Sequence, residues 1–211
     1  MEQLTIVAFG DSITQAIEVP AEQRWPALLE EQLAGCLAPR PVKVVNAGIG
    51  GNTSREGLAR IEGVLAERPT IVLVEFGGND TTDEPGRHVP LEEYLANLEL
   101  IQRAIQEKAG AIMVLLTFPP VVSEWIARLR PHIEPKHGGF DQHIELYRQA
   151  TRGFAAERGL ALIDIDRALR TAGEANGWES CFQTDGVHLT RGGNRVVSEA
   201  VLPVVQQILK A

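Results

Sequence analysis

Five short apolar segments, each followed by a longer helical pattern, constrain most strongly how this chain can fold. The segments are LTIVAF (4–9), VKVVNA (42–47), TIVLVEF (70–76), AIMVLLTF (111–118) and LALIDI (160–165). They are nearly continuous in apolar residues, as expected for parallel strands that are covered on both faces. Between and after them, apolar residues recur at three- and four-residue spacing, which predicts amphipathic helices. Strands and helices therefore alternate, and this predicts a parallel sheet with right-handed crossovers.

The length of the chain fits one domain of this kind. Its 211 residues can bury a full core, and its content of 44% hydrophobic and 23% charged residues is ordinary for a globular protein. Five strands fit an open three-layer α/β/α sandwich better than an eight-stranded barrel. We therefore expect a single domain over residues 1–211, with one irregular stretch at 119–140. That stretch is rich in Pro and Gly and longer than a normal strand–helix link, so we expect a flap with a short helix at 123–130.

The charge balance and the termini limit where such a protein acts. Lys and Arg number 20 against 28 Asp and Glu, a formal net charge of −8, which argues against nucleic-acid or anionic membrane partners. No basic region precedes the first apolar segment, which is too short for a signal peptide, and no segment approaches the length of a membrane span. We expect a cytoplasmic protein without stable membrane association. The sequence does not decide the oligomeric state or whether Cys36 and Cys181 pair.

Three polar loops directly follow predicted strands, and a fourth follows a short helix after the last predicted strand. We expect all four at the carboxyl edge of the sheet, where open parallel sheets bind ligands. They are GDS (10–12), NAGIGGNTS (46–54), GGND (77–80) and TDGVHLT (184–190). Each loop taken alone is weak evidence for a site. Ser12 alone is more often a helix cap, and Asp185 and His188 alone are more often a turn residue and a surface histidine.

Together these loops contain the groups that acyl transfer requires. A serine hydroxyl becomes nucleophilic only when a base takes its proton, and the base must be oriented by a third group. His188 and Asp185, three residues apart, can both point into one crevice and act on Ser12. The tetrahedral intermediate also needs hydrogen-bond donors for its oxyanion, and Gly50–Gly51 and Asn79 offer backbone and amide N–H groups.

The same blocks resemble the SGNH (GDSL) hydrolase family over almost the whole chain. FGDS is similar to the nucleophile block, NAGIGGNTS and GGND to the two oxyanion blocks, and DGVH to the closing Asp-x-x-His block. The resemblance implies Ser12 as nucleophile, His188 as base and Asp185 as its orienting group. It also implies an oxyanion hole made of the Ser12 backbone N–H, Gly51 and Asn79; Gly51 is chosen over Gly50 because it directly precedes an Asn. The family implies no metal and no cofactor.

We therefore expect a flavodoxin-like sheet with strand order 2-1-3-4-5 and hydrolysis of carboxylic esters through an acyl-serine intermediate. The expected substrate is a small-molecule ester with a short acyl or acetyl group, and an acetylated sugar is one candidate. A lysophospholipase or thioesterase of the same family is an alternative, as is acyl transfer to another alcohol. A flavodoxin-like module that binds an anion on its glycine loop, without catalysis, is a further alternative. We expect residues 119–140 to limit the acyl or alcohol group without supplying a catalytic group.

Overall fold

All five predicted strands are present in one parallel sheet. The computed structural model describes residues 3–82, 84, 86–135 and 137–210. Its sheet has the order β2-β1-β3-β4-β5, which confirms the predicted fold class and strand order. The strands are β1 (Leu4–Gly10), β2 (Val42–Gly48), β3 (Ile71–Glu75), β4 (Ile112–Leu116) and β5 (Ala161–Ile163).

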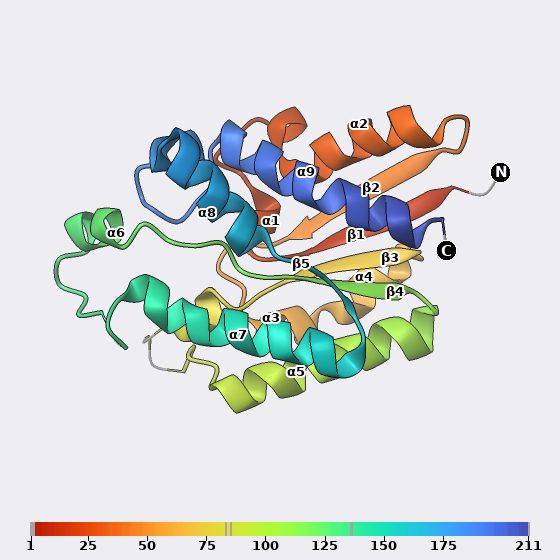
Figure 1. The fold of residues 1–211 in the computed structure, drawn as a ribbon. Helices are drawn as coiled ribbons and strands as arrows, with labels where there is room; N and C mark the ends of the chain where they lie inside the picture. The colour runs from red at the N-terminus through yellow and green to blue at the C-terminus, as the bar shows by residue number, and fades with distance from the viewer. Residues whose placement is uncertain (1–2, 83, 85, 136, 211) are drawn as a thin grey trace.

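Helices cover both faces of this sheet and make the three layers (Figure 1). In the view of Figure 1, α2, α8 and α9 lie above the sheet, and α3, α5 and α7 lie below it. A π-helical turn at Ala104–Lys108 continues α5, and 3-10 turns lie at Ala21–Gln23, Asn79–Thr81 and Trp178–Ser180. The α-helices are α1 (Ser12–Gln15), α2 (Trp25–Leu37), α3 (Ser54–Ala59), α4 (Ile61–Ala66), α5 (Leu91–Arg103), α6 (Ser123–Leu129), α7 (Phe140–Arg158), α8 (Ile165–Asn176) and α9 (Arg191–Ile208).

The core consists of two hydrophobic clusters, one on each face of the sheet. Alternate residues of β1 point to opposite faces: Ile6 joins the cluster under α2 and α9, and Val7 joins the cluster over α5 and α7. Both are completely buried, and burying a side chain of this size contributes about 1.5–3 kcal/mol to folding. The apolar runs of the central strands are explained by this double coverage.

The expectation that every apolar segment is covered on both faces is wrong for β2. All residues of β1 and β3 are buried, whereas every residue of β2 is half-buried or exposed. β2 is the edge strand beside β1, so one flank and part of each face remain open to solvent. Lys43, whose ammonium pairs with Glu67 at 2.8 Å, lies on this strand and protects the edge with a charge.

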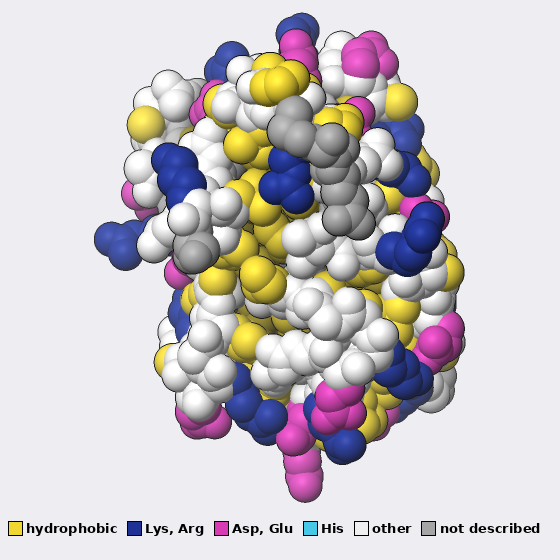
Figure 2. Space-filling view, turned by 90° about the vertical axis from the view of Figure 1, so that its right-hand side faces the viewer, with side chains coloured by type: hydrophobic (Ala, Val, Ile, Leu, Met, Phe, Trp, Pro, Cys, Tyr) yellow, Lys and Arg dark blue, Asp and Glu magenta, His cyan; other side chains and the backbone are white. Residues whose placement is uncertain are grey.

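The carboxyl ends of the strands lie in register and gather the loops that follow them. Gly10 is paired with Gly48 on one side and Glu75 on the other, and Glu75 is paired with Leu116. The opposite end of the molecule, near the chain termini, shows a central apolar area surrounded by charged side chains of both signs (Figure 2). Among the described residues, no helix has the length and apolar character that crossing a membrane requires. Cys36 is exposed, Cys181 is buried, and both are free thiols.

Candidate active site

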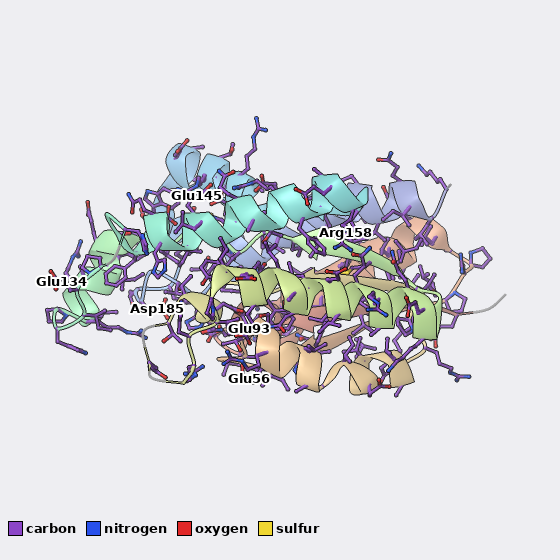
Figure 3. The ribbon with its side chains drawn as sticks, turned by 90° about the horizontal axis from the view of Figure 1, so that it is seen from below. Glu56, Glu93, Glu134, Glu145, Arg158 and Asp185 are labelled. Atoms are coloured by element: carbon purple, nitrogen blue, oxygen red, sulfur yellow. The ribbon has the colours of Figure 1, made fainter. Side chains whose placement is uncertain are left out.

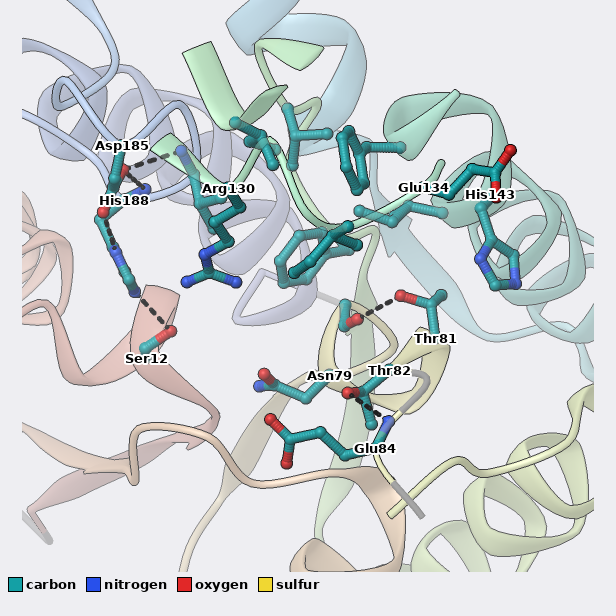
Figure 4. Close-up of a pocket in the computed structure, with 18 residues that line it drawn as sticks. Ser12, Asn79, Thr81, Thr82, Glu84, Arg130, Glu134, His143, Asp185 and His188 are labelled. Atoms are coloured by element: carbon teal, nitrogen blue, oxygen red, sulfur yellow. Dashed lines mark hydrogen bonds and ion pairs between the residues drawn. The ribbon is translucent and has the colours of Figure 1, made fainter. Parts of the chain in front are cut away.

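Three side chains from two distant loops form a hydrogen-bonded chain at the carboxyl edge of the sheet (Figure 4). His188 Nε2 lies 3.0 Å from Ser12 Oγ, and His188 Nδ1 lies 2.6 Å from Asp185 Oδ2. The other Asp185 oxygen accepts the backbone N–H groups of Val187 and His188 at 2.9 and 3.0 Å. Burial alone would raise the pKa of Asp185, but these hydrogen bonds outweigh it and lower the pKa below its usual value. The ionised carboxylate therefore fixes the ring with Nε2 directed at the serine.

In the GDS stretch, Asp11 caps helix α1. The Ser12 hydroxyl is therefore not used as the cap and faces His188. Asp11, and not Ser12, is the N-cap of α1, and its Oδ1 accepts the Ile13 N–H at 2.9 Å. A Cβ at position 10 would lie 2.3 Å from Thr14 Oγ1 and 2.6 Å from the Glu75 carbonyl oxygen, so only glycine fits there. The interpretation of Ser12 as a simple helix cap is therefore wrong.

The loop that carries Asp185 and His188 is held by contacts on both sides. Gln183 N–H donates to the His188 carbonyl at 2.7 Å, and Val122 N–H donates to the Gly186 carbonyl at 2.8 Å. Gly186 has a φ of +75°, and a Cβ there would lie 2.7 Å from the Val122 carbonyl oxygen. Glycine is thus required for the turn that brings the two side chains onto one side.

The predicted oxyanion donors lie in the neighbouring loops. Asn79 lines the same pocket as Ser12, and its amide donates to Asp11 Oδ2 at 2.9 Å and to the Asn52 carbonyl at 3.1 Å. Both amide hydrogens are therefore engaged within the protein. The Gly50 N–H donates to Gln15 Oε1 at 2.9 Å.

Gly51 is the one predicted site residue that does not line the pocket. It has a φ of +79°, a conformation that favours glycine, and its carbonyl accepts a bond of 2.7 Å from Arg87 Nη2. Its neighbour Asn52 connects this loop to Asn79. The structure therefore brings Ser12, Asn79, Asp185 and His188 to one pocket, with Gly51 in the adjacent loop.

Three buried acidic residues, which we call the carboxyl cluster, lie beneath Ser12: Asp11, Glu75 and Asp80. Burial raises the pKa of Asp11 to about 7 and the pKa of Asp80 to about 6. Burial, together with the charge of Asp11, raises the pKa of Glu75 well above its ordinary value. Glu75 Oε1 is buried and accepts no hydrogen bond, so a proton there can donate to Asp11. We take Glu75 as the member of this pair that is protonated.

Sequence reasoning missed Glu75 and Arg60. Arg60 donates to the carbonyls of Gly10 and Ala47, both at 2.8 Å, and to Asn52 Oδ1 at 2.7 Å, so it joins the ends of β1 and β2 to the glycine loop. A glutamate inside the apolar segment TIVLVEF was a signal that could have identified Glu75. Arg60 stands in an ordinary helical pattern and gave no such signal.

A cavity of about 560 Å³ opens beside the Ser12–His188 pair. Residues after β4 form much of its wall, and Asp185 and Glu134 both lie at this end of the molecule, away from Arg158 (Figure 3). Within the described residues, no group of three or more His, Cys, Asp or Glu is arranged to hold a metal ion. The apolar side chains of the lining are Phe118, Val121, Ile126, Ile133, Phe140, Ile144 and Val187.

Comparison with known proteins shows the family of this chain. The model of the GDSL-like lipase/acylhydrolase family matches residues 8–196. The chain belongs to this family. Esterase TesA of Pseudomonas aeruginosa is 30% identical over 206 residues, which cover 97% of this chain and 89% of that protein. An isoamyl acetate-hydrolyzing esterase 1 homolog of Bos taurus is 27% identical over 212 residues, which cover 96% of this chain and 81% of that protein.

A solved structure has the same fold as this GDSL hydrolase. The crystal structure of a lipase/acylhydrolase from Enterococcus faecalis superposes with a TM-score of 0.78 at 25% sequence identity, covering 97% of this chain and 96% of that one. The family match and the esterase relatives identify the chain as a carboxylic ester hydrolase.

Proposed function

We propose that this GDSL hydrolase cleaves small carboxylic esters through an acyl-serine intermediate on Ser12. The observation that carries the proposal is the hydrogen-bonded chain from Asp185 through His188 to Ser12, beside a cavity large enough for a small ester. Nucleophile, base and orienting group then stand in the order that serine acyl transfer requires.

Each residue of the chain has one role in the proposed reaction. His188 Nε2 takes the Ser12 proton as Oγ attacks the acyl carbon, and His188 then gives the proton to the leaving alcohol. A water molecule attacks the acyl-serine in the second half of the reaction, with His188 again as the base. Asp185 holds the ring and stabilises the imidazolium that forms.

The proposed oxyanion hole consists of the Ser12 N–H, the Gly51 N–H and the Asn79 amide. The Gly50 N–H is engaged by Gln15, which supports Gly51 as the glycine donor. The Asn79 amide has the longer of its two bonds, 3.1 Å, to the Asn52 carbonyl. We expect this bond to be released when Asn79 donates to the oxyanion.

The apolar cavity supports a short acyl or acetyl ester as the substrate. The name of the bovine relative refers to hydrolysis of isoamyl acetate, a small acetyl ester. Acetylated sugars are candidate substrates of this kind. A lysophospholipase or thioesterase activity is the alternative within the family. A chain-length series of aryl esters from acetyl to palmitoyl distinguishes these possibilities.

Substitution of Ser12 tests the proposal most directly. Ser12→Ala is expected to abolish turnover of an aryl acetate and covalent labelling by a fluorophosphonate, without loss of the fold. Asp185→Asn is expected to lower kcat by about 10³–10⁴-fold because the ring loses its orienting acceptor. His188→Gln should also be inactive, whereas His88→Gln, at an exposed histidine outside this pocket, serves as the matched control. A folded native protein that is neither labelled nor active would instead favour the anion-binding module.

We also propose that residues 1–211 act as one domain, in the cytoplasm, without nucleic-acid partners. The proposal is supported by the single sheet with its two hydrophobic clusters and by the acidic charge balance.

A further inference from the structure

Arg130 enters the cavity from the end of α6, and the backbone around it is fixed. Its N–H donates to the Ile126 carbonyl at 2.8 Å, and its carbonyl accepts the Ile133 N–H at 3.0 Å. At the other end of α6, Val122 N–H is bonded to Gly186, in the loop that carries His188. The position from which the Arg130 side chain extends is therefore tied to the position of the histidine.

The guanidinium of Arg130 is a cation in the cavity lining. Within the part of the chain that the structure describes, no side chain forms a hydrogen bond or an ion pair with it. The acidic residues of the same cavity are engaged elsewhere or lie apart from it. Glu84 is paired with Arg87 at 2.8 Å, Asp185 is bonded to His188, and Glu134 lies toward His143 in Figure 4.

The surroundings of Arg130 favour an anion as its partner. Arg130 is exposed, and apolar side chains, among them Ile126 and Ile133, line the cavity beside it. Near a protein surface, charged groups attract each other more strongly than in bulk water. A guanidinium also matches the geometry of carboxylate and phosphate groups, to which it can donate two parallel hydrogen bonds.

We propose that Arg130 binds an anionic group, a carboxylate or a phosphate, on the alcohol part of the ester. This inference rests on the proposed function, in which His188 Nε2 protonates the leaving alcohol, so that the alcohol part must extend from the His188 side of the cavity. Figure 4 shows the Arg130 guanidinium on that side, between His188 and the apolar wall. The substrate class is therefore an ester of a short acyl group with an anionic alcohol.

A matched pair of aryl acetates tests this assignment: 4-acetoxybenzoate, which is anionic, and 4-acetoxybenzamide, which has nearly the same shape and is neutral. The native enzyme is expected to prefer the benzoate by about tenfold in kcat/KM, a typical effect of one charge-assisted contact. Arg130→Gln should lower the ratio of the two kcat/KM values about tenfold, and Arg130→Lys should lower it less. Arg128→Gln, on the same helix but outside the cavity lining, should leave the ratio unchanged.

Equal kcat/KM values of the native enzyme for both esters, or an unchanged ratio in Arg130→Gln, would overturn the inference. If the glutamine variant does not fold, competitive inhibition of the native enzyme decides: 4-hydroxybenzoate must inhibit more strongly than 4-hydroxybenzamide, and equal inhibition contradicts the inference. A third ester, 4-acetoxyphenyl phosphate, shows which anion is preferred. Failure of the proposed function is recognised separately, because Ser12 would then not be labelled by the fluorophosphonate and neither acetate would be cleaved.

Discussion

Two groups of charged residues are wholly or partly buried in this molecule, and they differ in whether opposite charges lie beside them. The carboxyl cluster of Asp11, Glu75 and Asp80 has no Lys or Arg ion-paired with it among the described residues. The second group, which we call the arginine network, joins α7 to α8. It consists of Arg148, Arg152 and Arg170 with Asp141, Glu145, Asp164 and Asp166.

The arginine network compensates its buried charge. Arg148 is completely buried, and its guanidinium lies 2.9 Å from Asp141 Oδ1 and 2.6 Å from Glu145 Oε2. Burial alone would raise the pKa values of these two carboxyls, but the nearby arginines outweigh it and lower both. In the carboxyl cluster burial prevails, and the pKa values rise. The difference shows that the nearby cations, and not burial as such, decide the direction of the shift.

The two groups also differ in what they hold. Arg148 Nη1 donates to the Pro119 carbonyl at 2.8 Å, and Asp141 Oδ1 accepts the Val121 N–H at 2.9 Å, so the arginine network fixes the start of the cavity wall. The carboxyl cluster lies under the nucleophile, where Asp11 contacts both α1 and Asn79. The network joins α7, α8 and the start of the cavity wall, whereas the cluster lies at the site and its ionisation opposes folding.

The largest effect is expected from breaking the arginine network. Arg148→Met leaves Asp141, Glu145 and Asp166 without their central cation and should lower the free energy of unfolding by about 3–5 kcal/mol. Urea denaturation followed by circular dichroism measures this loss. A loss below about 1 kcal/mol would mean that the network is not a compensated unit.

A second effect is expected from pH, and it has opposite signs in the two groups. Asp11 and Asp80 bind protons more tightly when folded than when unfolded, because their pKa values rise from 3.8 to about 7 and about 6. Their contribution to the free energy of unfolding should therefore fall as pH increases from about 4 to about 7 and then stay constant. Asp141, Glu145 and Asp164 of the network have lowered pKa values and contribute stability that is lost only as pH falls below about 4. Urea midpoints that rise between pH 5 and pH 7 would contradict this assignment.

Removing one carboxyl from the cluster should stabilise the protein modestly. Glu75→Gln keeps the shape, and its amide can still donate to Asp11, while the cost of protonating the Glu75 carboxyl on folding is removed. At about pH 8 the free energy of unfolding should rise by about 1–2 kcal/mol, and its decrease between about pH 5 and pH 8 should become shallower. Thermal unfolding at two pH values measures both effects. A variant that is less stable than the native protein at pH 8 would show that Glu75 is favourable as a carboxylate.

The smallest effect is expected at an exposed ion pair, which serves as the reference for both groups. Lys43 and Glu67 lie 2.8 Å apart, but both side chains are well exposed to solvent. Glu67→Gln should change the free energy of unfolding by less than about 0.5 kcal/mol, and less still at high salt. A larger loss in the same urea assay would mean that exposed pairs matter here as much as buried ones.

The fold could be predicted because the apolar segments are long and regular. The three-residue β5 was the least exact case: the segment at 160–165 also contains Ile165, which already belongs to α8. The juxtaposition of Ser12, Asp185 and His188 was also predicted, because each stands in a loop at the same sheet edge, and the structure has them hydrogen-bonded. Their catalytic roles remain predictions.

The buried charges could not be predicted from the pattern. Arg148 stands in an amphipathic helix, where periodicity assigns a charged residue to the surface, yet its partners come from positions up to 29 residues away along the chain. Arg130 lies in a connection without regular spacing, so its direction depends on how α6 packs on the Gly186 loop. Such placements follow from tertiary contacts that a single sequence does not display.

The hydrogen bond between Val122 and Gly186 bears on how substrate range can change during evolution. An insertion or deletion that moves α6 also pulls on the loop of His188, so loop length and catalytic rate cannot vary independently. Single substitutions on α6 or just after it, at Ile126, Arg130 or Ile133, reshape the cavity without disturbing that bond. Divergence between close relatives, and useful libraries for laboratory selection, should therefore concentrate on side chains at these positions rather than on exchange of the whole segment.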